Sequence, residues 1–147
     1  LSLGISYEES KKRVAEAIDS GLALSKFNEW IKAQGGDMSS FTSEAPYSYE
    51  LKAAEDGYIS AMNAEIIGTS SVILGAGREN KDDVIDMKAG IVLKRKTGDK
   101  VKTGEPIAVL YSSNENKISK AADVFSSALT YSKSPVKKNP LIYSVIK

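Results

Sequence analysis

The order of glycines and charges between Gly68 and Gly104 constrains the fold of this chain more than any other feature. A helical pattern ends there at Gly75-Ala76-Gly77, and an acidic segment, residues 79–86, follows it. A basic strand and a Gly98-Asp99 hairpin turn come next. Glycine turns of this kind end helices and connect short strands. The sequence therefore predicts an α+β domain in which a short helix packs on a small sheet.

Two amphipathic helices are predicted before this domain. Ser6 and Glu9 form a capping-box pattern, in which each side chain accepts a hydrogen bond from a backbone amide. Apolar residues then recur at helical spacing, and Gly21 separates them from a second helix that ends at Gly35-Gly36. A helical pair within residues 1–37 is too small to be stable alone, so we expect it to pack on another part of a longer chain.

The rest of the chain reads as a Ser-rich linker, residues 38–46, followed by a domain over residues 47–147. Hydrophobic periodicity predicts its elements. We expect strands at 47–51, 58–62, 90–96, 107–111 and 141–146, and helices at 63–74 and 114–132. The fold class is α+β: a small mixed sheet or barrel of the hammerhead or barrel-sandwich type with packing helices, preceded by a helical hairpin. Four strand tyrosines are predicted to pack in or near the core: Tyr47, Tyr49, Tyr58 and Tyr111.

Two missing residue types restrict the chemistry of the chain. The 147 residues include no Cys and no His. A thiol nucleophile, a disulfide and a zinc–thiolate site are therefore excluded, and so is the commonest general base. The net charge of +1 gives no overall attraction to nucleic acid or to an anionic membrane. No apolar run approaches the length of a membrane span, and Leu1 in place of an initiator Met suggests a start inside a longer polypeptide.

The segment Gly75-Ala76-Gly77-Arg78 has two interpretations. Glycine amides beside an Arg can bind a phosphate. Here, however, the glycines follow the helix, and the C-terminal end of a helix carries the negative end of its dipole. The interpretation we favour is a helix C-cap and a sharp turn, with Arg78 tethering the loop.

The acidic residues that follow resemble a metal cluster. Asp82, Asp83 and Asp86 lie close together, but they lack the glycine and the closing Glu of a calcium loop. Lys81 and Lys88 flank them and would compete with a cation. We therefore expect a solvated acidic loop, no metal site and no cofactor.

A stripe of basic residues follows the acidic loop, and it has two interpretations. Nucleic-acid binding would favour aromatic residues between the basic ones, and none occurs there. The alternative is a solvent-exposed hairpin face whose lysines discourage strand pairing. We expect no nucleic-acid partner, although a salt-dependent shift of labelled RNA or DNA would support one. The stripe comprises Lys88, Lys94, Arg95, Lys96, Lys100 and Lys102.

The segment 90–110 also resembles the hairpin of a biotinyl or lipoyl carrier. A carrier needs a Lys at a hairpin tip after the last strand, because the cofactor is attached to its amine. Asn114 occupies that position here. Ala61-Met62-Asn63 resembles a second attachment sequence, but Asn63 again stands where a carrier needs Lys. A non-catalytic biotinyl/lipoyl-like interaction module therefore remains the alternative function.

A wider set of residues in order resembles the C-terminal portion of the pyrimidine-nucleoside phosphorylase family, which includes thymidine phosphorylase. The resemblance begins at residues 20–27 and 34–37, which look like the helical end of the family's large α/β domain. It continues through Gly57-Tyr58-Ile59 and residues 74–78 to Gly98-Asp99-Lys100-Val101, Gly104 and Leu110-Tyr111.

The resemblance implies an enzyme that converts a pyrimidine nucleoside and phosphate into the free base and a pentose 1-phosphate. Such enzymes are cytoplasmic homodimers, and phosphate is their co-substrate. Their Lys-His-Ser and glycine-rich phosphate motif is absent here. The resemblance thus implies no catalytic residue in this chain, which we expect to be inactive without the α/β and helical domains. We expect a cleft-closing loop formed by Gly75, Gly77, Arg78, Glu79, Lys81 and Asp82.

Overall fold

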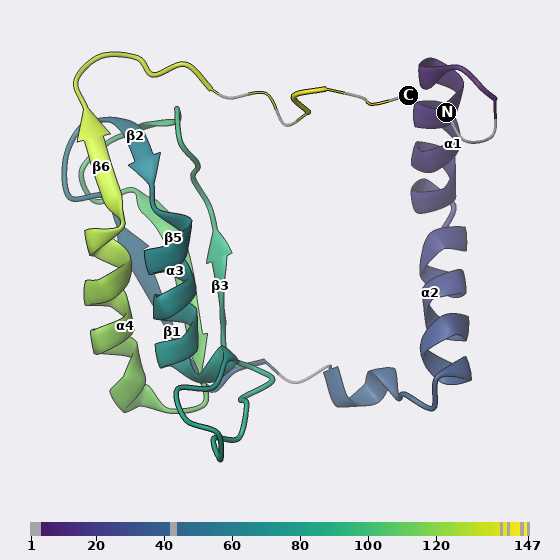
Figure 1. Ribbon diagram of the computed structural model, residues 1–147, viewed down its shortest axis with the longest axis horizontal. Helices are drawn as coiled ribbons and strands as arrows, with labels where there is room; N and C mark the ends of the chain where they lie inside the picture. Colours follow the sequence, from purple (N-terminus) through teal and green to yellow (C-terminus); the bar gives the residue numbers. More distant parts are fainter. Residues whose placement is uncertain (1–3, 42–43, 139, 141, 145, 147) are drawn as a thin grey trace. The chain divides into compact units, whose positions relative to one another are not determined.

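The computed structural model describes residues 4–41, 44–138, 140, 142–144 and 146. The chain divides into two compact units, Leu1–Ser43 and Glu44–Lys147. Figure 1 shows the helices of the first unit and the packed helices and strands of the second. Within the described residues, no helix is both long enough and apolar enough to cross a membrane.

The first unit contains helices α1 (Tyr7–Asp19) and α2 (Leu22–Ala33) and a short 3-10 helix, η1 (Met38–Phe41). Ser6 caps α1 by accepting from the Glu9 amide at 3.1 Å, as predicted. The Glu9 carboxylate does not complete the capping box, because it accepts instead from Arg13 Nε at 2.8 Å. Gly21, with φ of 77°, joins the two helices. Although every residue of α1 and α2 is described, none is buried.

The second unit contains two separate three-stranded sheets. The first has the order β1-β5-β3, formed by β1 (Tyr47–Lys52), β5 (Pro106–Ser112) and β3 (Gly90–Leu93). The second has the order β4-β2-β6, formed by β4 (Lys100–Val101), β2 (Gly57–Met62) and β6 (Leu129–Ser132). All pairings are antiparallel, so the sheets are not mixed, and neither closes into a barrel. The predicted α+β class is confirmed.

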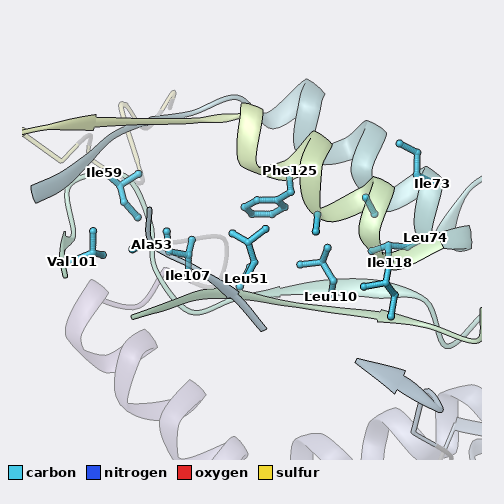
Figure 2. Packing of buried hydrophobic residues seen from close by; sticks show 13 residues of the cluster. Leu51, Ala53, Ile59, Ile73, Leu74, Val101, Ile107, Leu110, Ile118 and Phe125 are labelled. Carbon is cyan, nitrogen blue, oxygen red and sulfur yellow. The ribbon is translucent and has the colours of Figure 1, made fainter. Parts of the chain in front are cut away.

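Two helices cover the first sheet and enclose the core. They are α3 (Ala64–Ser71), which continues into the π-helical turn η2 (Val72–Ala76), and α4 (Glu115–Ser127). Figure 2 shows Phe125 of α4 directed towards Leu51 and Leu110 of the sheet. Phe125, Leu110 and Ile59 are fully buried. Burial of each such side chain contributes about 1.5–3 kcal/mol, so this cluster is the main source of stability in the unit.

The small residues of α3 allow close contact with α4. Ser70 is fully buried, and its hydroxyl donates to the Ala121 carbonyl of α4 at 2.8 Å. Asn63 caps α3 by accepting from the amides of Glu65 and Ile66. Buried side-chain polar atoms all have partners among the described residues.

The predicted helix over residues 114–132 is wrong at its C-terminal end. α4 ends at Ser127, and Leu129–Ser132 forms β6, which pairs with β2. Leu129 lies four residues after Phe125, so it continues the helical periodicity, but pairing with Met62 of the distant strand β2 overrides that local pattern.

Two further predictions differ from the structure. The described residues 142–144 and 146 belong to no strand, whereas residues 141 and 145 of the strand predicted at 141–146 lie outside the described residues. Tyr58 and Tyr111 are half-buried as predicted, but Tyr47 and Tyr49 are 40% and 48% exposed. Both tyrosines line an open groove beside α4, which explains their exposure.

Candidate functional site

Of the predicted cleft-closing residues, Gly75 lies in η2, and the others lie in the loop that follows η2 and leads to β3. Gly75 is buried, whereas Arg78, Glu79, Lys81 and Asp82 are all exposed. Arg78 makes no hydrogen bond or ion pair with any described residue, so the predicted Arg tether is wrong. The structure therefore places four charged side chains of this loop in solvent, where they are accessible to another molecule or domain.

The two glycines of the loop are required by local geometry. Gly75 has φ of 113°, and a Cβ there would lie 3.1 Å from the Asp86 Cβ. A Cβ on Gly77 would lie 2.8 Å from Cγ2 of Val72. Gly75 interrupts the helical backbone inside η2 and Gly77 caps its C-terminal end, so neither glycine presents a positive helix terminus to an anion.

Asp86 is the residue that holds the loop in place. Its carboxylate accepts from the Ser113 amide at 2.7 Å and from the Ser113 hydroxyl at 2.9 Å. The Lys88 amide donates to it at 3.0 Å, and the Asp86 amide donates to the Gly75 carbonyl at 2.9 Å. Burial raises the pKa of Asp86, but the hydrogen bonds outweigh that effect and hold the pKa below its usual value. Asp86 therefore connects the loop to the junction of β5 and α4.

Asp83 has a similar role at the tip of the loop. Its carboxylate accepts from the amides of Asn80 at 2.7 Å and Glu79 at 2.9 Å. These hydrogen bonds lower the pKa of Asp83, and the one from the Asn80 amide has the largest effect. No group of three acidic residues suited to a metal ion occurs among the described residues. Two of the three aspartates thus organise the loop and are not simply solvated, a role that residue spacing did not reveal.

A polar recess of about 280 Å³ lies beside the loop. Gly77 and Glu79 line it together with Asp83. Lys117 of α4 supplies an ammonium group on its wall, a contribution that sequence reasoning missed because the two segments lie 30 or more residues apart. The recess combines carboxylate and ammonium groups, so it can bind a polar group.

The two acidic residues of the hairpin, Asp99 and Glu105, pair with one basic residue outside the stripe and one within it. Asp99 accepts from the Lys96 amide at 2.8 Å and pairs with Lys138 from the segment after β6. The hydrogen bond from Lys138 is the main reason that the pKa of Asp99 is lowered. Arg95 lies 4.0 Å from Glu105. These ion pairs agree with a solvated hairpin face.

The two asparagines of the carrier interpretation both begin helices. Asn114 caps α4 by accepting from the Asn116 amide at 3.0 Å, and Asn63 caps α3. β5 therefore runs into a helix and not into the hairpin tip that a carrier needs. The resemblance to a carrier hairpin does not extend beyond the strand.

Comparison with known proteins identifies the source of this fold. The pyrimidine nucleoside phosphorylase C-terminal domain family matches residues 58–132. The pyrimidine-nucleoside phosphorylase of Geobacillus stearothermophilus is 38% identical over 96% of this chain and 34% of its own length. The enzymes of Bacillus subtilis and Staphylococcus haemolyticus are 41% and 43% identical over 74% of the chain and 26% of their lengths.

The chain thus spans about a third or less of the length of these curated relatives. The family match includes both sheets except β1, and it covers the loop tied by Asp86 as well as α4. The resemblance noted from the sequence is confirmed: the chain belongs to the pyrimidine nucleoside phosphorylase C-terminal domain family.

Proposed function

We propose that this chain is the C-terminal part of a pyrimidine-nucleoside phosphorylase and has a structural role in that enzyme. The parent reaction joins phosphate to the pentose of a pyrimidine nucleoside and releases the base. The observation that supports this proposal is 38% identity to a phosphorylase over 96% of the chain. Its partners are then the α/β and helical domains of the enzyme, which acts as a cytoplasmic homodimer.

Inactivity of the chain by itself is part of the proposal. No His occurs in the sequence, and no Lys-His-Ser phosphate motif is present. The recess beside the loop has carboxylate and ammonium groups but no group activated for attack. We therefore assign no catalytic residue and no cofactor to this chain, and phosphate would bind elsewhere in the parent enzyme.

The unit Leu1–Ser43 would belong to the interface with the rest of the enzyme. Its helices expose apolar side chains, including Val14, Leu24 and Trp30, which are between 55% and 62% exposed. We assign residues 1–37 to the helical end of the large domain, 38–46 to a linker and 47–147 to the C-terminal domain.

The loop between Gly75 and Asp86 would close the cleft of the parent enzyme. Its exposed Arg78, Glu79, Lys81 and Asp82 have charged groups available for contacts. Asp86 fixes the base of the loop, so these groups are presented from an ordered support. Arg78, which has no partner among the described residues, would contact the opposite side of the cleft.

A chimeric enzyme tests these assignments. The corresponding third of the Geobacillus stearothermophilus enzyme is replaced by this chain, and release of uracil or thymine is measured with phosphate at saturating nucleoside. We expect activity from the chimera and none from the isolated chain. Base release by the isolated chain would contradict the assignment of no catalytic residue.

Arg78→Ala in the chimera tests the loop. We expect a lower rate at saturating nucleoside with an unchanged melting temperature, because Arg78 is exposed and makes no hydrogen bond or ion pair with a described residue. Lys94→Ala, another exposed basic residue on the hairpin, is the matched control and should leave the rate unchanged. Equal rates for the chimera and its Arg78→Ala variant would exclude cleft closure by this residue.

A further inference from the structure

β1 is an edge strand beside an open groove. It pairs with β5 on one side only, so its other side has a row of backbone N–H and C=O groups with no strand partner among the described residues. A groove of about 560 Å³ separates the first half of β1 from α4. An edge strand next to a helix is an arrangement in which proteins accept an extended segment as an additional strand.

The groove is lined by side chains that the fold directs inward but does not cover. In the register of β1 with β5, Tyr49 pairs with Leu110 and lies on the same face as the buried Leu51. Tyr49 and Tyr47 are nevertheless 48% and 40% exposed. Ile118 and Ala122 of α4 supply the apolar floor. The groove thus offers apolar surface on the core side of the sheet.

The charge of the groove selects a cationic occupant. Glu115 and Asp123 line it, together with Ser48 and Ser119, and no Lys or Arg does so. An extended segment with apolar side chains and flanking lysines would complement both the floor and the charge.

The segment that follows β6 has this chemistry. Residues 133–147 include four lysines and neither Asp nor Glu. Ile142, Tyr143 and Ile146 are 69%, 78% and 95% exposed. Six residues lie between Pro140 and residue 147, and β1 also has six residues. The segment therefore matches the edge strand in length and the groove in charge.

The start of this segment is already tied to the end of β1. Lys133 Nζ lies 3.2 Å from the Glu55 carboxylate and donates to the Asp56 carbonyl at 2.9 Å. Both residues lie in the turn that joins β1 to β2. Lys138 pairs with Asp99 in the neighbouring hairpin. A strand that continues from here along β1 would run antiparallel to it, from Lys52 towards Tyr47.

We propose that the segment containing Ile142, Tyr143 and Ile146 docks along the free edge of β1 in the same molecule. It adds a fourth, antiparallel strand to the first sheet and places apolar side chains in the groove against α4. The opposite edge strand is a poorer site for the same segment. β3 has only four residues, and Lys88 and Lys94 flank it, so like charges would repel the lysines. This inference does not depend on the proposed phosphorylase role.

Disulfide trapping tests the proposal, because the native chain has no Cys. Tyr143→Cys is combined with Ser48→Cys or with Tyr49→Cys. These two positions are adjacent and lie on opposite faces of β1, so the two pairs test residue 143 on either face of the strand. Tyr143→Cys with Val92→Cys on β3 is the matched control. Oxidation is followed on non-reducing gels and by mass spectrometry.

We expect a disulfide within one molecule in one of the β1 pairs, formed at least about tenfold faster than in the β3 control. Glu115→Lys with Asp123→Lys should slow it several-fold, and salt should also slow it. Equal rates for the β1 and β3 pairs, or a disulfide formed only between two molecules, would overturn the proposal.

Hydrogen exchange provides a test without cysteines. The full chain is compared with a chain that ends at Lys138, which keeps both lysine contacts. We expect the amides of β1 to exchange at least about tenfold faster in the shorter chain, while those of β5 are unchanged. Unchanged exchange in β1 would contradict the docked strand.

Discussion

The two units of this molecule use apolar residues in opposite ways. In Glu44–Lys147, side chains such as Phe125 and Ile59 are fully buried between helices and sheets. In Leu1–Ser43, no residue of α1 or α2 is buried, and Leu22 is 67% exposed. Local signals such as the Ser6 cap are enough to set where a helix begins, but a stable unit needs a core. The helices α1 and α2 of the first unit therefore form without a buried core of their own.

The largest expected effect distinguishes the two units directly. Phe125→Ala removes a fully buried ring and should destabilise the second unit by about 3–5 kcal/mol. Trp30→Ala, the matched change of an aromatic residue in the first unit, should leave unfolding of the second unit unchanged. Urea unfolding followed by circular dichroism of the strands measures both. A similar loss for the two variants would mean that the units share one core.

A pair of glycine substitutions probes the close approach of strands in the second unit. Gly57 has φ of 154°, and a Cβ there would lie 2.5 Å from the Ser132 carbonyl oxygen of β6. Gly57→Ala should therefore cost about 1–3 kcal/mol. Gly68→Ala is the control: it lies in α3 with no atom within 4 Å of its Cβ, and it should stabilise by up to about 1 kcal/mol. Thermal melts that rank the two variants in the reverse order would refute this account.

A smaller effect concerns pH and the hydrogen-bonded aspartates. The pKa of Asp86 is lowered in the folded chain, so its contribution to stability is present above the unfolded value of 3.8. That contribution is lost as the pH falls through the lower, folded pKa. Asp86→Asn should reduce the melting temperature at pH 7 and weaken its decline below pH 4.

Asp82→Asn, an exposed neighbour in the same loop, is the control for charge alone. Its melting temperature should follow that of the native chain across the pH range. A parallel decline for native chain and Asp86→Asn below pH 4 would show that the contacts with Ser113 do not contribute.

The smallest expected effect on the second unit comes from the helix cap of the first. Ser6→Ala removes the hydrogen bond to the Glu9 amide and should weaken α1 by about 1 kcal/mol. Nuclear magnetic resonance shifts should then report lower helicity in α1, while the melting temperature of the second unit stays constant. A change in that melting temperature would show that the units are energetically coupled.

Sequence reasoning predicted the elements that local chemistry controls. The cap at Ser6 and the glycines that end η2 follow from backbone geometry, and the structure confirms them. It failed where partners lie far apart in the chain. Leu129 continues a helical pattern yet pairs with Met62, and Asp86 looks solvated in sequence yet binds Ser113, 27 residues later. No local spacing contains that information.

The strands β1 and β2 both pair with strands that come later in the chain, and this has a consequence during synthesis on the ribosome. Tyr47 pairs with Ser112, and Tyr58 pairs with Ser132. Translation proceeds from the N-terminus, so both early strands emerge long before their partners exist. Until those partners are made, β1 and β2 remain without a sheet. The nascent chain is then most exposed to aggregation, and to the factors that prevent it, before β4 and β5 leave the ribosomal tunnel.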